Sequence, residues 1–199
     1  MRKQTIAVAL LATCSVTAAM AQASGEGPWV VRARAVHLDM ANKDGTGLGL
    51  SVNNRTIAEV GVSYFIAPNM ATELTLTTPQ KQTVYLGEPS IGTFKHMPSS
   101  LLLQYHFTGL TGYKPYIGAG LNYTRISRVN LLDGGASLDK DSWGGALQIG
   151  VDMPLDKNWW LNFDVRKVYI RSDVFVGADN KGSLKLDPVF VGLGLGYRF

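Results

Sequence analysis

The feature that most constrains the fold of this chain is an alternation of apolar residues with polar or small ones. Its clearest segment is 143–152, where one set of alternate positions holds Trp143, Gly145, Leu147, Ile149 and Val151. The same pattern recurs over 101–107, 117–124 and 191–199. Successive side chains of a β-strand point to opposite faces, so a period of two predicts strands. We therefore expect an all-β chain.

Alternating segments separated by Pro- and Gly-containing connections predict eight strands. Their expected ranges are 28–40, 56–67, 70–78, 98–107, 114–126, 142–153, 159–171 and 188–199. The connections alternate between short ones (67–70, 108–113 and 154–158) and long ones (41–55, 79–97, 127–141 and 172–187). An even strand number with this alternation is typical of outer-membrane barrels. The prediction is an eight-stranded antiparallel transmembrane β-barrel with short periplasmic turns and long extracellular loops.

The two faces of the predicted strands differ in polarity. One face is consistently apolar, as at Val60, Val62, Tyr64, Ile66, Leu74, Leu76, Trp159, Leu161, Phe163 and Val165. The other face carries Arg32, Arg34, Glu59, Glu73, Gln104, His106, Asp152, Asp164, Arg166 and Arg198. An Arg or Lys facing lipid at the bilayer midplane costs ~2–4 kcal/mol, so we expect the polar face to line the lumen, where opposite charges pair. A lipocalin-like soluble barrel, the alternative, would have its apolar face inside.

Aromatic residues gather near the short-turn end and the chain termini. They are Trp29, Tyr64, Phe65, Tyr105, Phe107, Tyr113, Tyr116, Trp159, Trp160, Tyr197 and Phe199. This placement predicts an interfacial girdle at the periplasmic rim, with ordinary aromatic enrichment in strands as the alternative. The terminal Phe199 resembles the C-terminal signal by which barrels are recognised for insertion, so the barrel assembly machinery is an expected partner.

The N-terminus has the pattern of a secretory signal peptide. Arg2 and Lys3 precede a stretch of mostly apolar or small residues, and Ala19-Met20-Ala21 forms a cleavage site. We expect a signal peptide over 1–21 and a barrel domain over 22–199; a short membrane anchor is the alternative. Cys14 ends a segment with a loose likeness to a lipoprotein processing box, but the conventional site after it favours an incidental Cys. No internal run reaches the ~18–20 apolar residues of a spanning helix.

Removal of this segment also changes the charge balance. Lys plus Arg falls from 19 to 17 against 15 Asp plus Glu, so the formal net charge falls from +4 to +2. No cluster of basic residues remains, and we expect no nucleic-acid partner. The single Cys leaves with the signal, so no disulfide framework is expected.

The sequence contains few residues in patterns that predict catalysis, metal binding or cofactor binding. The best candidate for a nucleophile with a base is His96 with Ser99, at an expected loop-to-strand junction, but the two are three residues apart, whereas lipid-A deacylase barrels place His and Ser two apart. No His, Cys or Asp cluster has metal-ligand spacing. The glycines of 192–196 lack the helix that a dinucleotide-binding loop needs. We therefore expect no enzyme activity, metal or cofactor.

The lumen-facing positions change character toward the long-loop end. Val36, Leu38, Val168 and Ile170 continue the inward pattern but are apolar, which predicts a hydrophobic pocket near the outer mouth. A β-bulge that swaps the two faces is the alternative. Inward positions also hold Gly118, Gly120, Gly144, Gly150, Gly192, Gly194 and Gly196. Either bulky neighbours such as Trp160 and Phe190 fill the space beside them or a small cavity persists.

Several ordered motifs resemble one known family. They are Lys95-His96-Met97-Pro98-Ser99 with Leu102-Leu103-Gln104-Tyr105, the run Lys114 to Thr124, Leu138 to Gly144 with Gln148 to Asp152, Leu186-Asp187-Pro188, and Gly196-Tyr197-Arg198-Phe199. Together they span nearly the whole chain after the signal and resemble the outer membrane protein W (OmpW/AlkL) family. The resemblance implies an eight-stranded barrel in the outer membrane of Gram-negative bacteria. It also implies passive uptake of small hydrophobic molecules, which meet a pocket and leave sideways through the wall because the periplasmic half is plugged.

The chain departs from the family where members place a Leu and a Trp at the pocket floor. The corresponding positions are Thr75 and Arg166. We expect the lumen to be plugged or gated by Glu73, Thr75, Gln104, Asp164, Arg166 and Arg198, with Val36, Leu38, Val168 and Ile170 as the pocket wall.

Three functional hypotheses follow, in order of preference. The first is the hydrophobic-solute channel, with outer-membrane lipid and the solute as partners. The second is a structural or receptor barrel, whose long loops bind a bacteriocin or a host surface above a plugged lumen. The third is a barrel enzyme that uses His96 and Ser99.

Overall fold

The computed structural model describes residues 27–177 and 179–199. The expected signal peptide over 1–21 and the expected start of the barrel domain at residue 22 lie outside these residues. Eight long strands form the body of the molecule: β1 (Trp29–Asp39), β4 (Arg55–Ala67), β5 (Met70–Thr77), β7 (Ser90–His106), β8 (Lys114–Leu131), β10 (Asp141–Pro154), β11 (Trp159–Val168) and β14 (Val189–Arg198). Among the described residues, no helix is long and apolar enough to cross a membrane.

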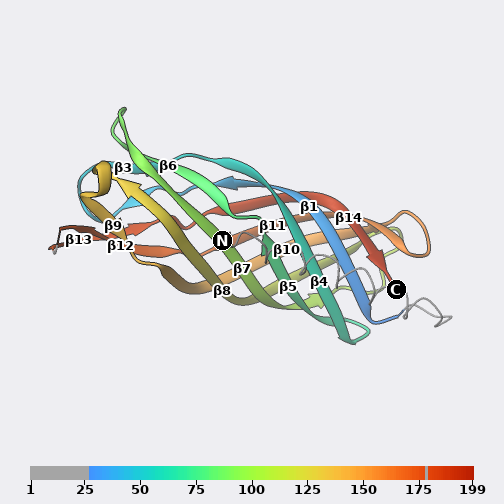
Figure 1. Cartoon of the computed structure of the whole chain (residues 1–199). Coiled ribbons are helices and arrows are strands. Elements are labelled where there is room, and N and C mark those ends of the chain that lie inside the picture. The colour runs from blue at the N-terminus through green and yellow to red at the C-terminus, as the bar shows by residue number, and fades with distance from the viewer. Residues whose placement is uncertain (1–26, 178) are drawn as a thin grey trace, which may run out of the picture.

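The eight strands form a closed antiparallel ring. β1 pairs with β4, and pairing continues through β5, β7, β8, β10 and β11 to β14, which pairs back onto β1. Figure 1 shows these strands running along one axis, with the C-terminus at one end and β9, β12 and β13 at the other. The predicted barrel is confirmed. Most predicted strand ends agree within one residue, because alternation is strict where one face meets lipid.

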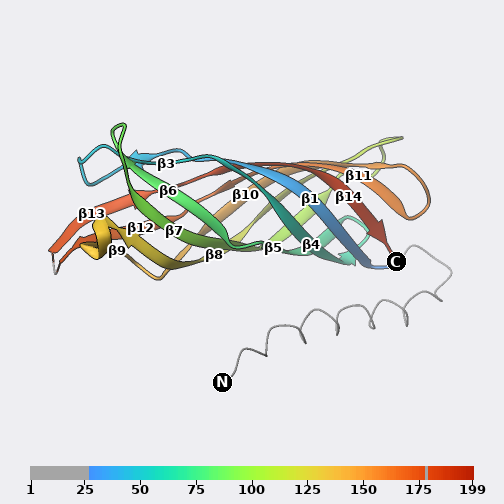
Figure 2. The ribbon, with the colours of Figure 1, turned by 45° about the horizontal axis from the view of Figure 1, so that its top comes forward.

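The long connections are more ordered than the sequence predicted. They contain β2 (Lys43–Asp44), β3 (Leu50–Val52), β6 (Gln80–Leu86), the 3-10 turn η1 (Leu132–Gly134), β9 (Ala136–Leu138), β12 (Arg171–Val176) and β13 (Asp179–Lys185). β7 begins at residue 90 and β8 continues to residue 131, well beyond their predicted ends, while β11 stops three residues early. The prediction of loops was wrong here because β6 pairs with the extension of β7, and β12 pairs with both β9 and β13. These strands prolong the wall on the extracellular side (Figure 2).

The outer face of the ring is apolar and exposed, as lipid contact requires. Aromatic pairs mark the two ends of this surface. Trp29 with Tyr64 (ring centroids 4.7 Å apart) and Trp159 with Tyr197 (5.1 Å) lie near the short turns, and Tyr123 with Trp143 (4.9 Å) lies toward the long-loop end.

Two aromatic residues assigned to the girdle lie inside the barrel instead. Tyr116 is 1% exposed and Trp160 is 2% exposed. Each shares the inward parity of its strand, Tyr116 with Gly118 on β8 and Trp160 with Asn162 on β11. Closeness to a short turn suggested the girdle, but parity sets the direction of a side chain.

Candidate functional site in the barrel lumen

The periplasmic half of the lumen is closed by buried ion pairs. On β1, the Arg32 guanidinium lies 2.7 Å from an Asp152 carboxylate oxygen on β10 and 3.4 Å from Glu73 on β5. Two residues further along β1, Arg34 lies 2.7 Å from Glu73 and 3.0 Å from Glu59 on β4. These side chains are fully buried, and each guanidinium joins carboxylates from two strands. The ion pairs therefore tie opposite walls of the barrel together.

Arg166 forms the upper layer of this network. Its guanidinium donates to Glu59 Oε2 (2.6 Å) and to the Thr75 hydroxyl (2.6 Å), and Asp164 Oδ1 lies 3.7 Å away. Its face also packs over the Phe190 ring, with the guanidinium carbon 5.3 Å from the centroid. Arg166 thus lies at the boundary between the charged half of the lumen and the apolar half.

Amides and a phenol fill the space between the charges. Gln104 Nε2 donates to Glu73 (2.7 Å) and to the Gln148 carbonyl oxygen (2.9 Å), and Gln148 Nε2 donates to Asp164 (2.6 Å). The Tyr116 hydroxyl lies 3.3 Å from Asp164 as donor. Every carboxylate of the network therefore has donors around it, which is what makes buried charge tolerable. We call the set Arg32, Arg34, Glu59, Glu73, Thr75, Gln104, Gln148, Asp152, Asp164 and Arg166 the ionic plug.

Glycines make room for the plug. A Cβ at Gly150 would overlap the Tyr116 ring, and one at Gly118 would lie 2.8 Å from Gln148 Oε1. At Gly61 it would lie 2.7 Å from Glu73 Oε1. Of the two alternatives for the inward glycines, the filled lumen applies in this half, although the filling side chains are mainly polar.

The predicted gating residues fall in two places. Glu73, Thr75, Gln104, Asp164 and Arg166 all belong to the ionic plug. Arg198 instead lies half-buried at the periplasmic rim, where its Nε donates to the Gly27 carbonyl (2.8 Å) and its guanidinium stacks over Phe65 and Trp160. Sequence reasoning missed Gln148 and Asn162 as members of the lumen interior, although their inward parity marks both.

The extracellular half of the lumen is apolar. The predicted pocket residues Val36, Leu38, Val168 and Ile170 are all fully buried in one hydrophobic cluster. β1 keeps an unbroken register with β4 and with β14 over these positions, so no bulge swaps the faces of β1 there. Other members of the cluster come from the extracellular strands: Leu50, Val52, Val84, Phe94, Ile126, Leu131, Leu138, Val174 and Leu184. We call this cluster the apolar chamber.

A small hollow opens into the chamber at its extracellular end. Its lining is apolar throughout: Leu48, Leu50, Val84, Leu86, Ile91, Leu131, Leu132, Ala136, Leu138, Val174, Val176 and Leu184. Its volume is about 60 Å³. An engineered cavity that takes up benzene measures ~150 Å³, so a solute of that size enters only if the extracellular strands move apart.

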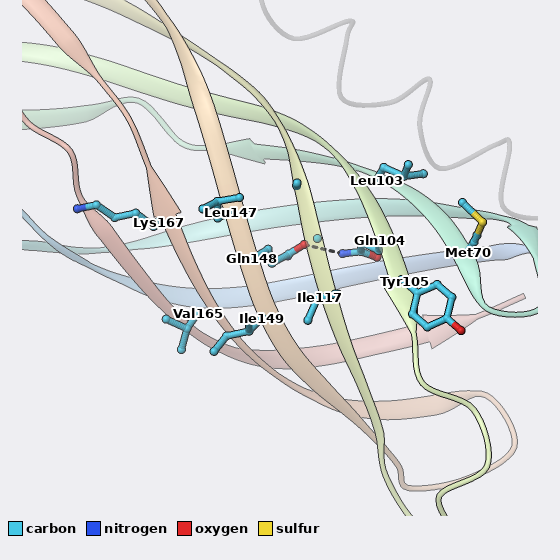
Figure 3. Close-up of a pocket in the computed structure, with 12 residues that line it drawn as sticks. Met70, Leu103, Gln104, Tyr105, Ile117, Leu147, Gln148, Ile149, Val165 and Lys167 are labelled. Atoms are coloured by element: carbon cyan, nitrogen blue, oxygen red, sulfur yellow. Dashed lines mark hydrogen bonds between the residues drawn. The ribbon is translucent and has the colours of Figure 1, made fainter.

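A larger hollow of about 620 Å³ lies on the outer wall and not in the lumen. Figure 3 shows Leu103, Ile117, Leu147 and Ile149 around it, with the hydrogen bond between Gln104 and Gln148 behind. The hollow is mainly apolar because most of its lining residues face lipid, and Gly118 gives it depth toward Gln104 and Gln148 of the ionic plug. We assign it to lipid chains, and the lumen remains the candidate functional site.

The hydrogen-bonded wall is interrupted between β5 and β6 on one side of β7. β5 pairs with β7 up to Leu76 opposite Ser99, and β6 resumes at Gln80 opposite His96. In the described part of the chain, neither strand supplies a register partner for Met97 or Pro98. Pro98 has no N–H to donate, and its carbonyl accepts a hydrogen bond from the Thr77 hydroxyl (2.8 Å). We call this place the wall break.

The candidate catalytic pair does not come together. His96 is buried inside the barrel, whereas Ser99 lies on the opposite face of β7. Three residues along a strand reverse the side-chain direction, so the two groups cannot act as a dyad. Nor does any group of three or more His, Cys, Asp or Glu among the described residues have the arrangement of a metal site.

Comparison with known proteins decides the family. The model of the OmpW family matches residues 26–199. The chain belongs to the OmpW family. This OmpW-family protein is 37% identical to the uncharacterized outer-membrane protein y4mB of Sinorhizobium fredii (89% of this chain, 82% of the relative). It is 31% identical to outer membrane protein W of Escherichia coli over the full length of both, and 29% identical to the dibenzothiophene metabolism operon protein PahQ of Pseudomonas aeruginosa.

Solved structures agree with this assignment. The outer membrane protein OprG of Pseudomonas aeruginosa has a TM-score of 0.74 at 26% identity, covering 87% of this chain and 96% of that one. The outer membrane protein AlkL in lipid bilayers shares the fold, with a TM-score of 0.69 at 23% identity over 90% and 94% of the two chains. This OmpW-family chain is therefore an outer-membrane barrel, and its exposed apolar belt contacts outer-membrane lipid.

Proposed function

We propose that this OmpW-family barrel allows passive uptake of small hydrophobic molecules across the outer membrane. The observation that carries the proposal is the division of the lumen. An apolar chamber opens toward the outside and ends on an ionic plug that spans the barrel. An apolar solute gains by entering the chamber, but it cannot displace paired charges without leaving them buried and unpaired.

Passage therefore needs a second opening above the plug, and we assign it to the wall break. Strands separate most easily where backbone hydrogen bonds are missing, and Pro98 supplies no donor there. The interruption adjoins His96, whose partner on β8 is the chamber residue Ile126, and Met97 at the interruption lies on the outer face of β7. A solute that leaves here enters the membrane without crossing the plug.

The names of relatives fit such a role. PahQ is named as a protein of a dibenzothiophene metabolism operon, and dibenzothiophene is an apolar aromatic compound. The family resemblance implied a Leu and a Trp at the positions of Thr75 and Arg166. In this chain the Arg166 guanidinium donates a hydrogen bond to Thr75, so the floor under the apolar chamber is polar.

The second candidate is a structural or receptor barrel for a bacteriocin or a host surface. It is favoured by the small volume of the extracellular hollow and by the strands β6, β12 and β13, which lengthen the wall at the end away from the C-terminus. No residue of the chain is proposed to act as a catalyst in either case.

Uptake into liposomes distinguishes the two candidates. A small hydrophobic fluorescent probe should enter liposomes that contain the protein faster than protein-free liposomes. Leu184→Asp, which puts a charge into the apolar mouth, should remove most of the gain. Lys185→Asp, at the next residue on the other face of β13, should leave it unchanged. Equal rates with and without the protein would contradict the channel and favour the receptor barrel.

We also propose that the barrel assembly machinery recognises Phe199. Its ring packs 4.9 Å from that of Tyr197 at the periplasmic edge. Phe199→Ala should lower the amount of folded barrel in the outer membrane, whereas Phe107→Ala in a periplasmic connection should not. Equal amounts of folded protein for wild type and Phe199→Ala would contradict this role.

A further inference from the structure

The apolar chamber contains one polar pair whose hydrogen-bonding capacity is only half used. Gln82 on β6 and His96 on β7 are 0% and 1% exposed, and their side-chain nitrogens Nε2 lie 3.2 Å apart. Among the described residues, Gln82 Oε1 and His96 Nδ1 have no hydrogen-bond partner. A buried donor or acceptor left unpaired costs about 1–3 kcal/mol, so such a pair calls for an explanation.

The surroundings of the pair are apolar. Phe94 lies opposite Gln82 in the β6–β7 register, and its ring meets that of His96 edge-on at 5.9 Å. Ile126 lies opposite His96 on β8, and Val84 is the next inward residue on β6. Phe94, Ile126 and Val84 belong to the apolar chamber. Gln82 and His96 therefore lie among the packed side chains of the chamber, beside Val84, which also lines the small hollow.

The chemistry that the pair presents does not depend on how the amide is oriented. In a neutral imidazole one ring nitrogen donates and the other accepts. If Gln82 Nε2 donates to His96 Nε2, then His96 Nδ1–H remains as a donor and Gln82 Oε1 as an acceptor. If the amide is flipped, His96 Nε2–H donates to the amide oxygen, which leaves a donor on Gln82 and an acceptor on His96. In both cases one donor and one acceptor of the pair remain unpaired.

Other polar groups of this wall are already engaged with one another. Asn122 Nδ2 donates to Ser100 (3.0 Å), and the Thr124 hydroxyl donates to Asn122 Oδ1 (2.7 Å). The facing wall carries Val36, Leu38, Val168 and Ile170, which have no polar side-chain atoms. Ser172 on β12 also has a buried hydroxyl with no partner among the described residues, but Gln82 and His96 combine an unpaired donor and an unpaired acceptor in one contacting pair.

We propose that Gln82 and His96 bind the polar head of an amphiphilic solute, a small apolar molecule that carries one hydroxyl group. The hydroxyl forms a hydrogen bond with the unpaired atom of Gln82 or with that of His96, since a hydroxyl can donate or accept, while the apolar body lies against Phe94 and the facing wall. This inference rests on the proposed uptake function and narrows its solute from any hydrophobic molecule to an alcohol or a phenol.

Two probes of nearly equal size test the proposal, 1-naphthol and 1-methylnaphthalene. Their binding to the full barrel in lipid nanodiscs is measured by equilibrium dialysis, and partition into empty nanodiscs is subtracted. One hydrogen bond of ordinary strength predicts that the wild type binds 1-naphthol about fivefold more tightly. The variant Gln82→Leu with His96→Phe, which replaces the pair by apolar groups, should lose this preference by weakening 1-naphthol alone.

Thr124→Val is the matched control, because it removes a lumen hydroxyl that is already bonded to Asn122 and should keep the preference. The side-chain amide resonances of Gln82 in the wild type should shift with 1-naphthol and not with 1-methylnaphthalene, which tests the proposal even if the double variant does not fold. Equal binding of both probes to the wild type would overturn the proposal and leave the uptake function standing. A preference that survives in the double variant would also overturn it. If neither probe binds above the empty nanodiscs, the uptake function itself fails.

Discussion

Arg166 shows how much of the lumen depends on a single side chain. Its guanidinium bonds to Glu59 and Thr75 at the top of the ionic plug. Removing one partner of a buried charge pair leaves the other uncompensated, and such losses reach about 3 kcal/mol. We expect Arg166→Met to lower the free energy of unfolding by about this amount, measured by urea titration in lipid vesicles.

The same measurement on Arg166→Met with Glu59→Gln should recover part of the loss, because the stranded charge is then removed as well. Lys181→Met, which breaks an exposed ion pair with Asp179, should give no measurable change. An unchanged unfolding free energy for Arg166→Met would contradict the plug as described.

At the extracellular end, Asp44 organises the connection between β2 and β3. Its carboxylate accepts hydrogen bonds from the backbone N–H groups of Thr46 (2.8 Å), Gly49 (2.7 Å) and Leu50 (3.1 Å), and from the Thr46 hydroxyl (2.6 Å). Partial burial alone would raise the pKa of Asp44, but these donors outweigh it and lower the pKa below its usual range. The stabilisation is therefore complete above the ordinary carboxyl pKa and is lost as the pH falls through the lowered one.

We accordingly expect the amides of Gly49 and Leu50 to keep their protection from hydrogen exchange at neutral pH and to lose it in strong acid. Asp44→Asn should remove much of this protection already at pH 7, whereas Asp179→Asn in the β12–β13 hairpin should not. Protection that is equal in wild type and Asp44→Asn would show that the carboxylate does not hold this connection.

Which residues line the lumen could be predicted from the sequence, but which of them pair could not. Strand parity places Glu73, Asp164 and Arg166 inside, because a period of two leaves only two directions. Parity says nothing of how strands far apart in the chain face each other across the barrel. The pairing of Arg166 with Glu59, 107 residues away in the chain, therefore appears only in three dimensions.

At the scale of elements, strands could be predicted from the sequence where they face lipid, and less well outside the lipid-facing belt. Inside the belt every second residue is apolar, and strand ends such as Ala67 and Met70 were predicted to the residue. Beyond the belt, solvent meets the outer face and the interior is only partly apolar, so alternation weakens. The sequence therefore predicts a loop over Gln80–Leu86, where the inward residue Gln82 is polar, but this segment forms a strand that pairs with β7.

The wall break makes a prediction about these strands. Leu76 and Ser99 are directly opposed just below it, and the Ser99 carbonyl turns toward β8, where it accepts from Asn122. They therefore form a non-hydrogen-bonded pair on the outer face, whose Cβ atoms approach closely enough for a cross-strand disulfide. Leu76→Cys with Ser99→Cys should, when oxidised, slow delivery of a hydrophobic probe into the membrane and regain the wild-type rate on reduction.

A second cross-strand disulfide, placed elsewhere in the wall, provides the control. Ala119 on β8 and Leu147 on β10 are also opposed on the outer face, away from the break. Ala119→Cys with Leu147→Cys should leave delivery unchanged in either redox state. Equal slowing of probe delivery by both disulfides would mean that the exit is not at Met97 and Pro98.

The whole molecule is a barrel with its apolar surface turned outward and a lumen divided along its axis. Eight strands enclose a space that side chains just fill, so the contents of the lumen decide what can pass. In the periplasmic half these contents are paired charges, and in the extracellular half they are mainly apolar side chains. The central claim is that a small hydrophobic molecule occupies the apolar chamber above the plug.

Methyl-detected NMR in nanodiscs of deuterated lipid tests this claim most directly. With 1-methylnaphthalene as the probe, the account predicts nuclear Overhauser contacts from the probe to the methyl groups of Val36, Leu38, Val168 and Ile170. Contacts confined to the lipid-facing methyl groups, such as those of Leu147 and Ile149, would place the probe in the membrane outside the barrel and contradict the account.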